Sequence, residues 1–368
     1  MNATFNYSTN YFFVKLLILS CLLLIASQTY AQSKEKYLAS VSFDPTPRNQ
    51  SGLRIVFYNV ENLFDYFDDS LTIDEAFTPL GEYYWNKSRY QDKLNKLAKT
   101  ILAIGGWEPP ALIGLCEIEN RYVLESLTNF TQLKQIGYEI IHQDSKDRRG
   151  IDVAAIYRPD KFELVNYEYY KLKFPLDIES RTRDILHVVG RLPNQDTLHY
   201  FVNHWPSKFG GAFETEPKRM YAAQFLRKKV DSLFNLNKDS HIVISGDFND
   251  EPEEESMTES FGMQLEKNAL VKTDLYNLMY DIRFKTGTHS FQNKWSIIDQ
   301  FIVSGNLMNK EFTTSVFNNT ALIFDMGWLI MEGATGAKRP FRTYQGPKYI
   351  GGYSDHLPIY LDLILRKY

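Results

Sequence analysis

The stretch His241-Ile-Val-Ile-Ser-Gly-Asp-Phe-Asn-Asp-Glu-Pro252 decides how this chain is organised. Its apolar, β-branched start predicts a short strand that is buried on both faces of a sheet. Ser245-Gly246 is a turn signal, and Asp247 and Asn249 follow it on one face of the chain, with Phe248 on the other. A carboxylate and a carboxamide leaving a strand together suit a hard cation or a phosphate. Alone, the stretch would be better interpreted as an Asx-rich turn after a buried strand.

Five other short apolar runs end in the same kinds of side chain, which favours a shared site. Each has a structural alternative: Glu117 could cap the N-terminus of a following helix, and His204 could be a satisfied core histidine. Asp299 lies between apolar neighbours, where an unpaired carboxylate is costly, so we expect it to have a partner, most naturally a histidine. Because α/β sheets place their sites outside strand ends, the set together predicts one site. Its members are Asn59 with Glu61, Glu117, His204, Asp247 with Asn249, Asp299, and Asp355 with His356.

Elsewhere the hydrophobic pattern predicts short strands with a few helices between them. The stretch 65–85 is acidic and aromatic and is predicted to be a loop, whereas 305–350 matches neither a helix nor a strand pattern. No repeat or break in composition divides 53–368, so we expect one domain there. The predicted strands are 53–58, 111–116, 138–142, 151–157, 186–191, 198–202, 241–244, 296–303 and 357–365, and the predicted helices are 89–104, 120–135 and 215–235.

The first residues have the pattern of an export signal. Lys15 precedes an apolar run, 16–26, that is too short to span a bilayer comfortably but is typical of a signal peptide. Small residues before Ala31 suit cleavage there. We therefore expect a signal peptide, 1–31, a linker, 32–52, and a secreted or periplasmic mature protein. The alternatives are an N-terminal membrane anchor and lipidation at Cys21, which the neighbouring sequence fits poorly.

The composition describes a mildly acidic chain with room for a large core. The formal net charge is −4 over 368 residues, 44% of them hydrophobic, which excludes a polybasic nucleic-acid scaffold. Any nucleic acid would be held by local Lys and Arg side chains and by bound metal. Only Cys116 remains after signal cleavage, so no intramolecular disulfide is possible, and we expect a buried thiol.

In the order of its motifs, the chain resembles the endonuclease/exonuclease/phosphatase superfamily, the deoxyribonuclease I-like fold. The resemblance implies an α/β four-layer sandwich, with two mostly antiparallel sheets packed face to face and helices outside. It also implies hydrolysis of a phosphate ester with Mg²⁺ or a similar cation. The stretches that carry it are FYNVENLFD (57–65), LIGLCEIEN (112–120), RRGIDVAAIYRP (148–159), RTRDILHVVG (181–190), VNHWPSK (202–208), GDFND (246–250), SIIDQFIVS (296–304) and YSDHLPI (353–359).

The resemblance assigns metal and water positions residue by residue. Glu117 and Asn59 match the principal metal-binding pair, and Asp355 a further carboxylate on the metal side. Asp247 matches the carboxylate that positions or activates the attacking water, and Asn249 the amide that holds the phosphate. Because these are oxygen ligands with no Cys/His zinc spacing, the expected ion is Mg²⁺, Mn²⁺ or Ca²⁺.

The resemblance assigns proton transfer and phosphate contact to other residues. His204 resembles the histidine that protonates the leaving oxygen, and His356 resembles a second histidine that Asp299 orients. Arg183 is similar to an arginine that contacts phosphate, and Lys208 is a further candidate for substrate binding. Hydrolysis of a phosphate ester needs such groups independently of the resemblance, because cationic donors stabilise charge on the phosphoryl oxygens.

The chain departs from the family pattern in some places. The family often has a tyrosine near 151–157, which has no match here; Arg149 or Asp152 lies nearby, and Asp152 could orient His204. The role of Glu61, as ligand or surface residue, is open. In 305–350, Trp328 and Arg342 are candidates for substrate choice, with surface packing as the alternative. The remaining histidines are expected to be close to neutral for the rate: His142, His187, His199, His241 and His289.

These features favour an exported, metal-dependent phosphodiesterase that acts as a monomer on nucleic acid, as an endonuclease. Cationic residues near the site favour that substrate, and the acidic net charge speaks mildly against tight DNA binding. A second possibility is a lipid or small-molecule phosphoesterase, of the sphingomyelinase-like or inositol-phosphate type, which an exposed aromatic hairpin would favour. A third is a catalytically inactive binding module, against which the intact set of carboxylates and histidines argues.

Overall fold

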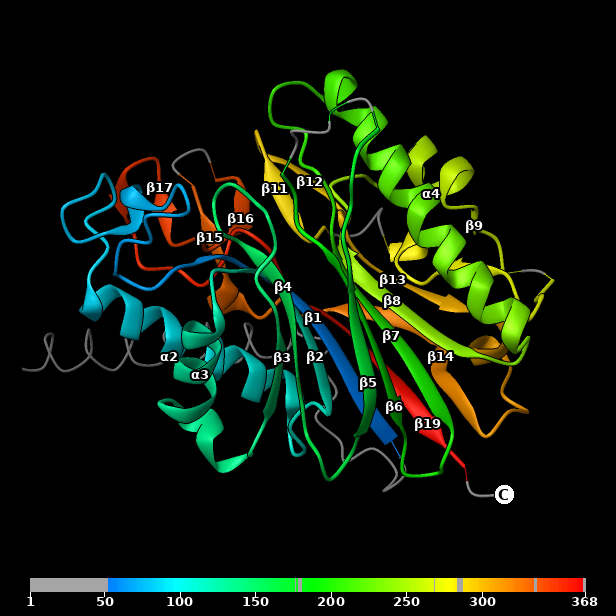
Figure 1. Cartoon of the computed structure of the whole chain (residues 1–368). Helices are drawn as coiled ribbons and strands as arrows, with labels where there is room; N and C mark the ends of the chain where they lie inside the picture. The colour runs from blue at the N-terminus through cyan, green and yellow to red at the C-terminus, as the bar shows by residue number, and fades with distance from the viewer. Residues whose placement is uncertain are drawn as a thin grey trace, which may run out of the picture. The chain divides into compact units, whose positions relative to one another are not determined.

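Two β-sheets that pack face to face organise the computed structural model of this chain (Figure 1). The structure describes residues 52–175, 177, 181–267, 269–282, 287–333 and 336–366, which all belong to one compact unit, Pro45–Tyr368. The predicted signal peptide, 1–31, and all but the last residue of the predicted linker, 32–52, lie outside the described residues. Gly52 already belongs to the first strand.

The first sheet has six strands in the order β14-β19-β1-β2-β4-β3, and the second has seven in the order β5-β6-β7-β8-β13-β10-β9. Most neighbouring strands are antiparallel, but β1 pairs with β2, β7 with β8, and β9 with β10 in parallel. The strands of the first sheet are β1 (Gly52–Leu63), β2 (Leu112–Ile118), β3 (Glu139–His142), β4 (Asp152–Tyr157), β14 (Thr314–Ile323) and β19 (Ile359–Leu365). Those of the second are β5 (Glu163–Tyr170), β6 (Ile185–Arg191), β7 (Thr197–His204), β8 (His241–Asp247), β9 (Met263–Gln264), β10 (Leu275–Asn277) and β13 (Asp299–Ser304).

Apolar side chains from the facing surfaces of both sheets form one core. Ile55 and Phe57 of β1 belong to the same buried cluster as Tyr200 of β7 and Val243 of β8. The Tyr200 hydroxyl also donates to the carbonyl of Val56, 3.3 Å away, which ties the sheets together. Burial of these side chains is the main term that holds the sheets face to face.

Helices cover the outer faces and complete four layers (Figure 1). The helices α2 (Lys87–Gly105) and α3 (Arg121–Asn129) lie outside the first sheet, and α4 (Ala212–Leu236) lies outside the second. Leu226 and Val230 of α4 pack in a second buried cluster with Ile242 and Ile244 of β8. The predicted four-layer α/β sandwich is confirmed. Within the described residues, no helix is long and apolar enough to cross a membrane.

Several predicted elements need correction. The predicted helix 120–135 ends at Asn129 and is followed by a 3-10 turn, Gln132–Gln135. The strand β5 and the short strands β9 and β10 were not predicted. The prediction that 305–350 has no regular pattern is wrong, because it contains β14 and two hairpins. These hairpins are β15 (Ile330–Glu332) with β16 (Lys338–Pro340), and β17 (Tyr344–Gln345) with β18 (Lys348–Tyr349); a third, β11 (His289–Phe291) with β12 (Lys294–Ser296), precedes them.

A buried histidine pair makes the second sheet sensitive to acid. His187 Nε2 lies 3.1 Å from His199 Nδ1, and the His187 ring stacks on Phe201 at 4.2 Å between centroids. Burial, with each ring next to another histidine, lowers the pKa of His187 to about 3 and that of His199 to about 4. The folded state therefore binds fewer protons than the unfolded state between these values and the usual histidine pKa.

We expect the free energy of unfolding to fall as the pH drops below about 6.5, by roughly 2 kcal/mol per histidine between pH 7 and pH 5. The contribution of this pair to the free energy of unfolding is fully present above about pH 6.5. It is lost at lower pH, because protons bind the two histidines of the unfolded chain before those of the folded chain. Urea titrations at both pH values should show a smaller loss for the double variant His187→Leu/His199→Leu than for the wild type. An equal loss in both proteins would contradict this assignment.

Candidate active site

The strand pairing brings the predicted strand-end residues to one edge of the two sheets. His204, Asp247 and Asp299 lie side by side on β7, β8 and β13, because Asp247 is the register partner of both others. In the first sheet, β19 runs antiparallel to β1, so the loop before β19 lies where β1 ends. Ser354 fastens that loop by donating to the carbonyl of Asn59 at 2.8 Å.

The backbone is irregular at these strand ends, and the irregularities turn side chains toward the site. The pairing of β1 with β2 shifts register after Asn59, and that of β2 with β4 shifts around Glu117. Glu61, Asn62, Glu117 and Asn249 all have left-handed backbones, with φ between 49° and 62°. Such bulges and strained residues re-aim side chains and are concentrated at functional sites.

His356 and Asp299 form a buried pair. His356 Nδ1 lies 2.7 Å from Asp299 Oδ2, and this confirms the predicted partner of Asp299. Burial opposes a charge on the ring, but Asp299, Asp247 and Asp355 outweigh it and hold the pKa of His356 well above its usual value. The ring is therefore protonated at neutral pH, with Nε2 directed toward Asp247, 3.8 Å away.

Asp247 is at the centre of the cluster. Its Oδ2 accepts from Asn59 Nδ2 at 3.0 Å, and its Oδ1 accepts from the backbone N–H of Asn249 at 3.0 Å. Burial, with Asp299 and Glu117 nearby, raises the pKa of Asp247 to about 7 against the opposing charge of His356. A carboxylate with such a pKa can accept a proton near neutral pH.

Asn59 and Glu117 link the two sheets, but Asn59 is arranged as a donor. Its Nδ2 donates to Asp247 and, at 3.3 Å, to Glu117 Oε1, while its Oδ1 accepts from the N–H of Glu61. Asn59 thus orients two carboxylates through its amide N–H groups. Its Oδ1 keeps a second lone pair beside the bond from Glu61, so the role of Asn59 as an oxygen ligand stays a prediction. Glu117 remains partly exposed, with 14% of its side chain accessible.

A rigid corner at Trp205 holds His204 and two further predicted residues. The Trp205 side chain is fully buried, and its carbonyl accepts from Asn249 Nδ2 at 3.0 Å and from Arg183 Nη2 at 2.6 Å. Arg183 Nη1 also pairs with Asp147 at 3.1 Å. The predicted phosphate contact of Arg183 therefore needs correction: this side chain is buried and positions the corner behind His204.

His204 faces the cluster in its neutral form. Its Nε2 is 3.7 Å from Asp247 Oδ2 and 3.9 Å from Glu117 Oε1. Burial, with Arg183 and Arg149 on the other side, lowers the pKa of His204 well below its usual value. A neutral ring can donate a hydrogen bond to a phosphate oxygen, and the negative charge of a bound phosphate would favour the protonated form.

An ion network supports the loop that carries Asp355: Glu61, Arg342 and Asp355 are candidates from the sequence, whereas Lys93 and Thr343 are not. The Glu61 carboxylate accepts from the N–H of Thr343 at 2.7 Å and from Arg342 Nε at 3.3 Å. Arg342 Nη2 donates to Asp355 at 3.1 Å, and Lys93, buried on α2, lies 3.6 Å from Glu61. Glu61 is thus a buried structural carboxylate, and Arg342 is a site residue rather than surface packing.

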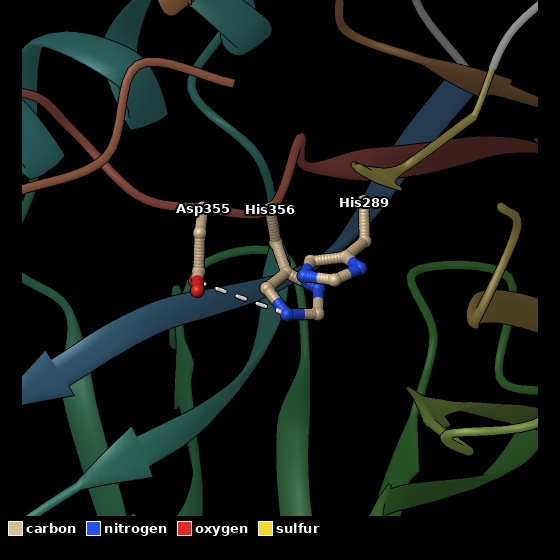
Figure 2. Close-up of side chains that lie close together, drawn as sticks. All are labelled: His289, Asp355 and His356. Carbon is tan, nitrogen blue, oxygen red and sulfur yellow. Dashed lines mark ion pairs between the residues drawn. The ribbon is translucent and has the colours of Figure 1, made fainter. Parts of the chain in front are cut away.

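His289 is a further residue that belongs to the site. Figure 2 shows its ring against that of His356, with Asp355 on the other side. The ring centroids are 4.8 Å apart, and Asp355 Oδ1 is 3.9 Å from His356 Nε2. The β11–β12 hairpin brings His289 back to the loop before β19, and the expectation that its replacement is close to neutral for the rate stays a prediction.

Two other predicted residues are engaged elsewhere. Lys208 pairs with Asp250 at 3.0 Å and Glu254 at 2.9 Å, so it is not available for substrate in this arrangement. Asp152 lies 3.2 Å from His142 Nε2 and accepts from the N–H of Ser145. The suggestion that Asp152 orients His204 is therefore wrong. The His204 Nδ1 atom is buried and has no hydrogen-bond partner among the described residues.

Comparison with known sequences identifies the family of this chain. A sequence model of the endonuclease/exonuclease/phosphatase family matches residues 54–365, almost the whole described part of the chain. The chain belongs to the endonuclease/exonuclease/phosphatase family. Members of this family are divalent-metal-dependent hydrolases of phosphate esters. No curated protein matches this chain.

Solved structures of family members share the fold at low sequence identity. A mannosyl-6-phosphatase from Bacteroides thetaiotaomicron VPI-5482 is 17% identical with a TM-score of 0.52, covering 85% of this chain and 100% of that one. The human Nocturnin catalytic domain is 15% identical with a TM-score of 0.52, covering 88% and 96%. Humanized D. rerio TDP2 is 13% identical with a TM-score of 0.52, covering 85% and 99%. These likenesses confirm the fold.

The carboxylate oxygens at this site suit the divalent cation on which members of this family depend. Two groups of side chains bring possible ligand atoms within 4.8 Å of one another, Asp355 with His289 and His356, and Asp247 with Asp299 and His356, but the charged ring of His356 in both would not bind a cation. Glu117 and Asp355 are the partly exposed carboxylates, with 14% and 22% of their side chains accessible. Hard carboxylate oxygens of this kind suit Mg²⁺, Mn²⁺ or Ca²⁺, with Glu117 and Asp355 as the groups that would hold the ion.

Proposed function

We propose that this family member is an exported, divalent-cation-dependent phosphodiesterase that hydrolyses nucleic acid by attack of water. The convergence of Asp247, His204 and the His356–Asp299 pair on one point supports the chemistry. The signal-like residues 1–31 and the single remaining thiol, Cys116, support the export part of the proposal.

Each residue has a role that follows from its surroundings. Asp247 accepts the proton of the attacking water, because its pKa lies near neutrality. The protonated His356, held by Asp299, and the amide of Asn249 donate to the phosphoryl oxygens. His204, which the charge of a bound phosphate favours in its protonated form, gives its Nε2 proton to the leaving oxygen and returns to the neutral ring. Glu117 and Asp355 would hold a divalent cation, which would neutralise negative charge on the phosphoryl group.

The charge balance of the site favours a diester over a monoester. Three nearby cations of the described chain are already paired: Arg183 with Asp147, Arg342 with Asp355 and Glu61, and Lys93 with Glu61. A phosphomonoester dianion would bring a second negative charge to a cluster whose own carboxylates exceed its cations. A diester monoanion meets less repulsion, and this paired state of the cations is the observation that carries the choice.

A second candidate is a phosphodiester in a lipid headgroup. The β11–β12 hairpin brings His289 to the site and carries Phe291, which is 67% exposed, at its tip. An exposed aromatic residue on a hairpin beside the site suits insertion into a membrane surface. It is a single side chain, however, and the hairpin also suits stacking against a nucleobase, so nucleic acid stays the first proposal.

A substrate panel tests the proposal. The purified mature chain, with Mg²⁺ or Mn²⁺ present, would be incubated with plasmid DNA, single-stranded RNA, sphingomyelin vesicles, bis-p-nitrophenyl phosphate and mannose 6-phosphate. We expect cleavage of nucleic acid and of bis-p-nitrophenyl phosphate. Exclusive release of phosphate from the monoester would contradict the diesterase assignment, and cleavage of sphingomyelin alone would favour the lipid candidate.

A further inference from the structure

A pocket lined by aromatic rings adjoins the catalytic cluster. It encloses about 300 Å³, at the lower end of the range for small-molecule sites. Three segments form it: the end of β1, the loop before α2, and residues 342–346 at the β17–β18 hairpin. The last two lie side by side at the left of Figure 1 although they are far apart in the sequence. The lining residues are Glu61, Asn62, Phe77, Tyr83, Trp85, Arg342, Thr343, Tyr344 and Gly346.

The walls are held in place from behind. Trp85 is buried and donates its Nε1–H to the carbonyl of Phe64 at 2.9 Å, and the buried Tyr344 donates its hydroxyl to the carbonyl of Tyr83 at 2.9 Å. Phe77 and Tyr83 are half-buried, and their ring centroids are 4.8 Å apart. The pocket is therefore a preformed aromatic wall with two ring surfaces that a ligand can reach.

Two contacts join the polar end of the pocket to the carboxylates that would hold the cation. The N–H of Asn62 donates to Glu117 Oε2 at 2.8 Å, and Arg342 Nη2 donates to Asp355 Oδ2 at 3.1 Å. Both Asn62 and Arg342 line the pocket. The polar end of the pocket is therefore continuous with Glu117 and Asp355, so a group attached to a phosphate held by these carboxylates could enter the pocket.

We propose that this pocket binds the nucleobase of the nucleotide next to the scissile phosphate. A flat ring can lie against the surface that Phe77 and Tyr83 form together, and the guanidinium of Arg342, which also lines the pocket, can stack on the outer face of that ring. Base–aromatic stacking tolerates every base, so the pocket selects nucleotides over other phosphodiesters without reading sequence. This inference rests on the proposed nucleic-acid function and names the part of the substrate that the pocket recognises.

The test compares binding of two ligands that differ only by the base. Calorimetric titration in Mg²⁺ buffer would measure the affinity for AMP and for ribose 5-phosphate. We expect wild type to bind AMP roughly 5- to 150-fold more tightly, which is the contribution of stacking one base. The double variant Phe77→Leu/Tyr83→Leu keeps apolar volume but removes both ring faces, and it should lose this preference while its affinity for ribose 5-phosphate is unchanged.

Tyr167→Leu is the matched control, because Tyr167 is a partly exposed aromatic residue on β5, in the other sheet, and its replacement should change neither affinity. Equal affinities in the wild type, undetectable binding of both ligands, a preference that persists in the double variant, or an equal loss for both ligands would each overturn the proposal. The substrate panel distinguishes a failure of the proposed pocket from a failure of the proposed nuclease function. Base preference without diester cleavage would contradict the nuclease function alone, and diester cleavage without base preference would contradict the pocket alone.

Discussion

His356→Ala is expected to lower kcat by about 10²–10⁴-fold while the protein stays folded, because it removes a positioned, protonated donor. The ring is held by Asp299 at 2.7 Å and faces Asp247, and it contributes little to the apolar core. Steady-state hydrolysis of bis-p-nitrophenyl phosphate, with circular dichroism as the check on folding, measures this. Asp299→Asn should lose less, since the ring remains but its charge is less stabilised.

A matched control for this variant is His241→Asn. His241 is also a buried histidine, but it starts β8, at the opposite end of the strand from Asp247. Its replacement should leave the rate close to that of wild type. A folded His356→Ala protein with unchanged kcat would show that the resemblance has placed the charged donor wrongly.

Asp247→Asn should lower kcat by a comparable factor of about 10²–10⁴, because an amide accepts no proton from water. The substitution preserves shape and leaves the Asn249 N–H with an acceptor, but its new NH2 group would face Asn59 Nδ2, so we expect a folded protein of somewhat lower stability. The same assay measures it, and the effect should fall on kcat rather than on KM.

Asp250→Asn separates the role of Asp247 from that of the surrounding turn. Asp250 is equally buried but pairs with Arg219 at 2.7 Å, away from the cluster. This control should lower stability and leave kcat of the folded protein unchanged. If Asp247→Asn and Asp250→Asn changed only stability, then Asp247 would be a structural carboxylate and the proposed base would have to be sought elsewhere.

The strand-end residues could be predicted from the sequence because their signal is local. An apolar run followed at once by Asp247 or Glu117 marks a buried strand that ends in a polar group, and sheet topology then brings such ends together. The partner of Asp299 could be predicted for a similar reason, since a buried carboxylate requires one.

The supporting residues could not be predicted, because their signal is long-range. Lys93 lies on a helix whose pattern shows only an apolar stripe, and its partners Glu61 and Thr343 are far away in the sequence. His289 belongs to a strand too short to show a period. In β14 the alternation is interrupted by Asn318 and Asn319, which have left-handed backbones at a register shift, so the strand was missed.

Activity is expected to require a divalent cation bound at Glu117, and the following measurement tests this requirement most directly. Hydrolysis of bis-p-nitrophenyl phosphate would be followed after dialysis against EDTA and again as Mg²⁺ or Mn²⁺ is added back, for the wild type and for Glu117→Gln. We expect no activity without the ion, recovery with it in the wild type, and a requirement for much higher ion concentrations in the variant. Full activity of the wild type in excess EDTA would contradict the account.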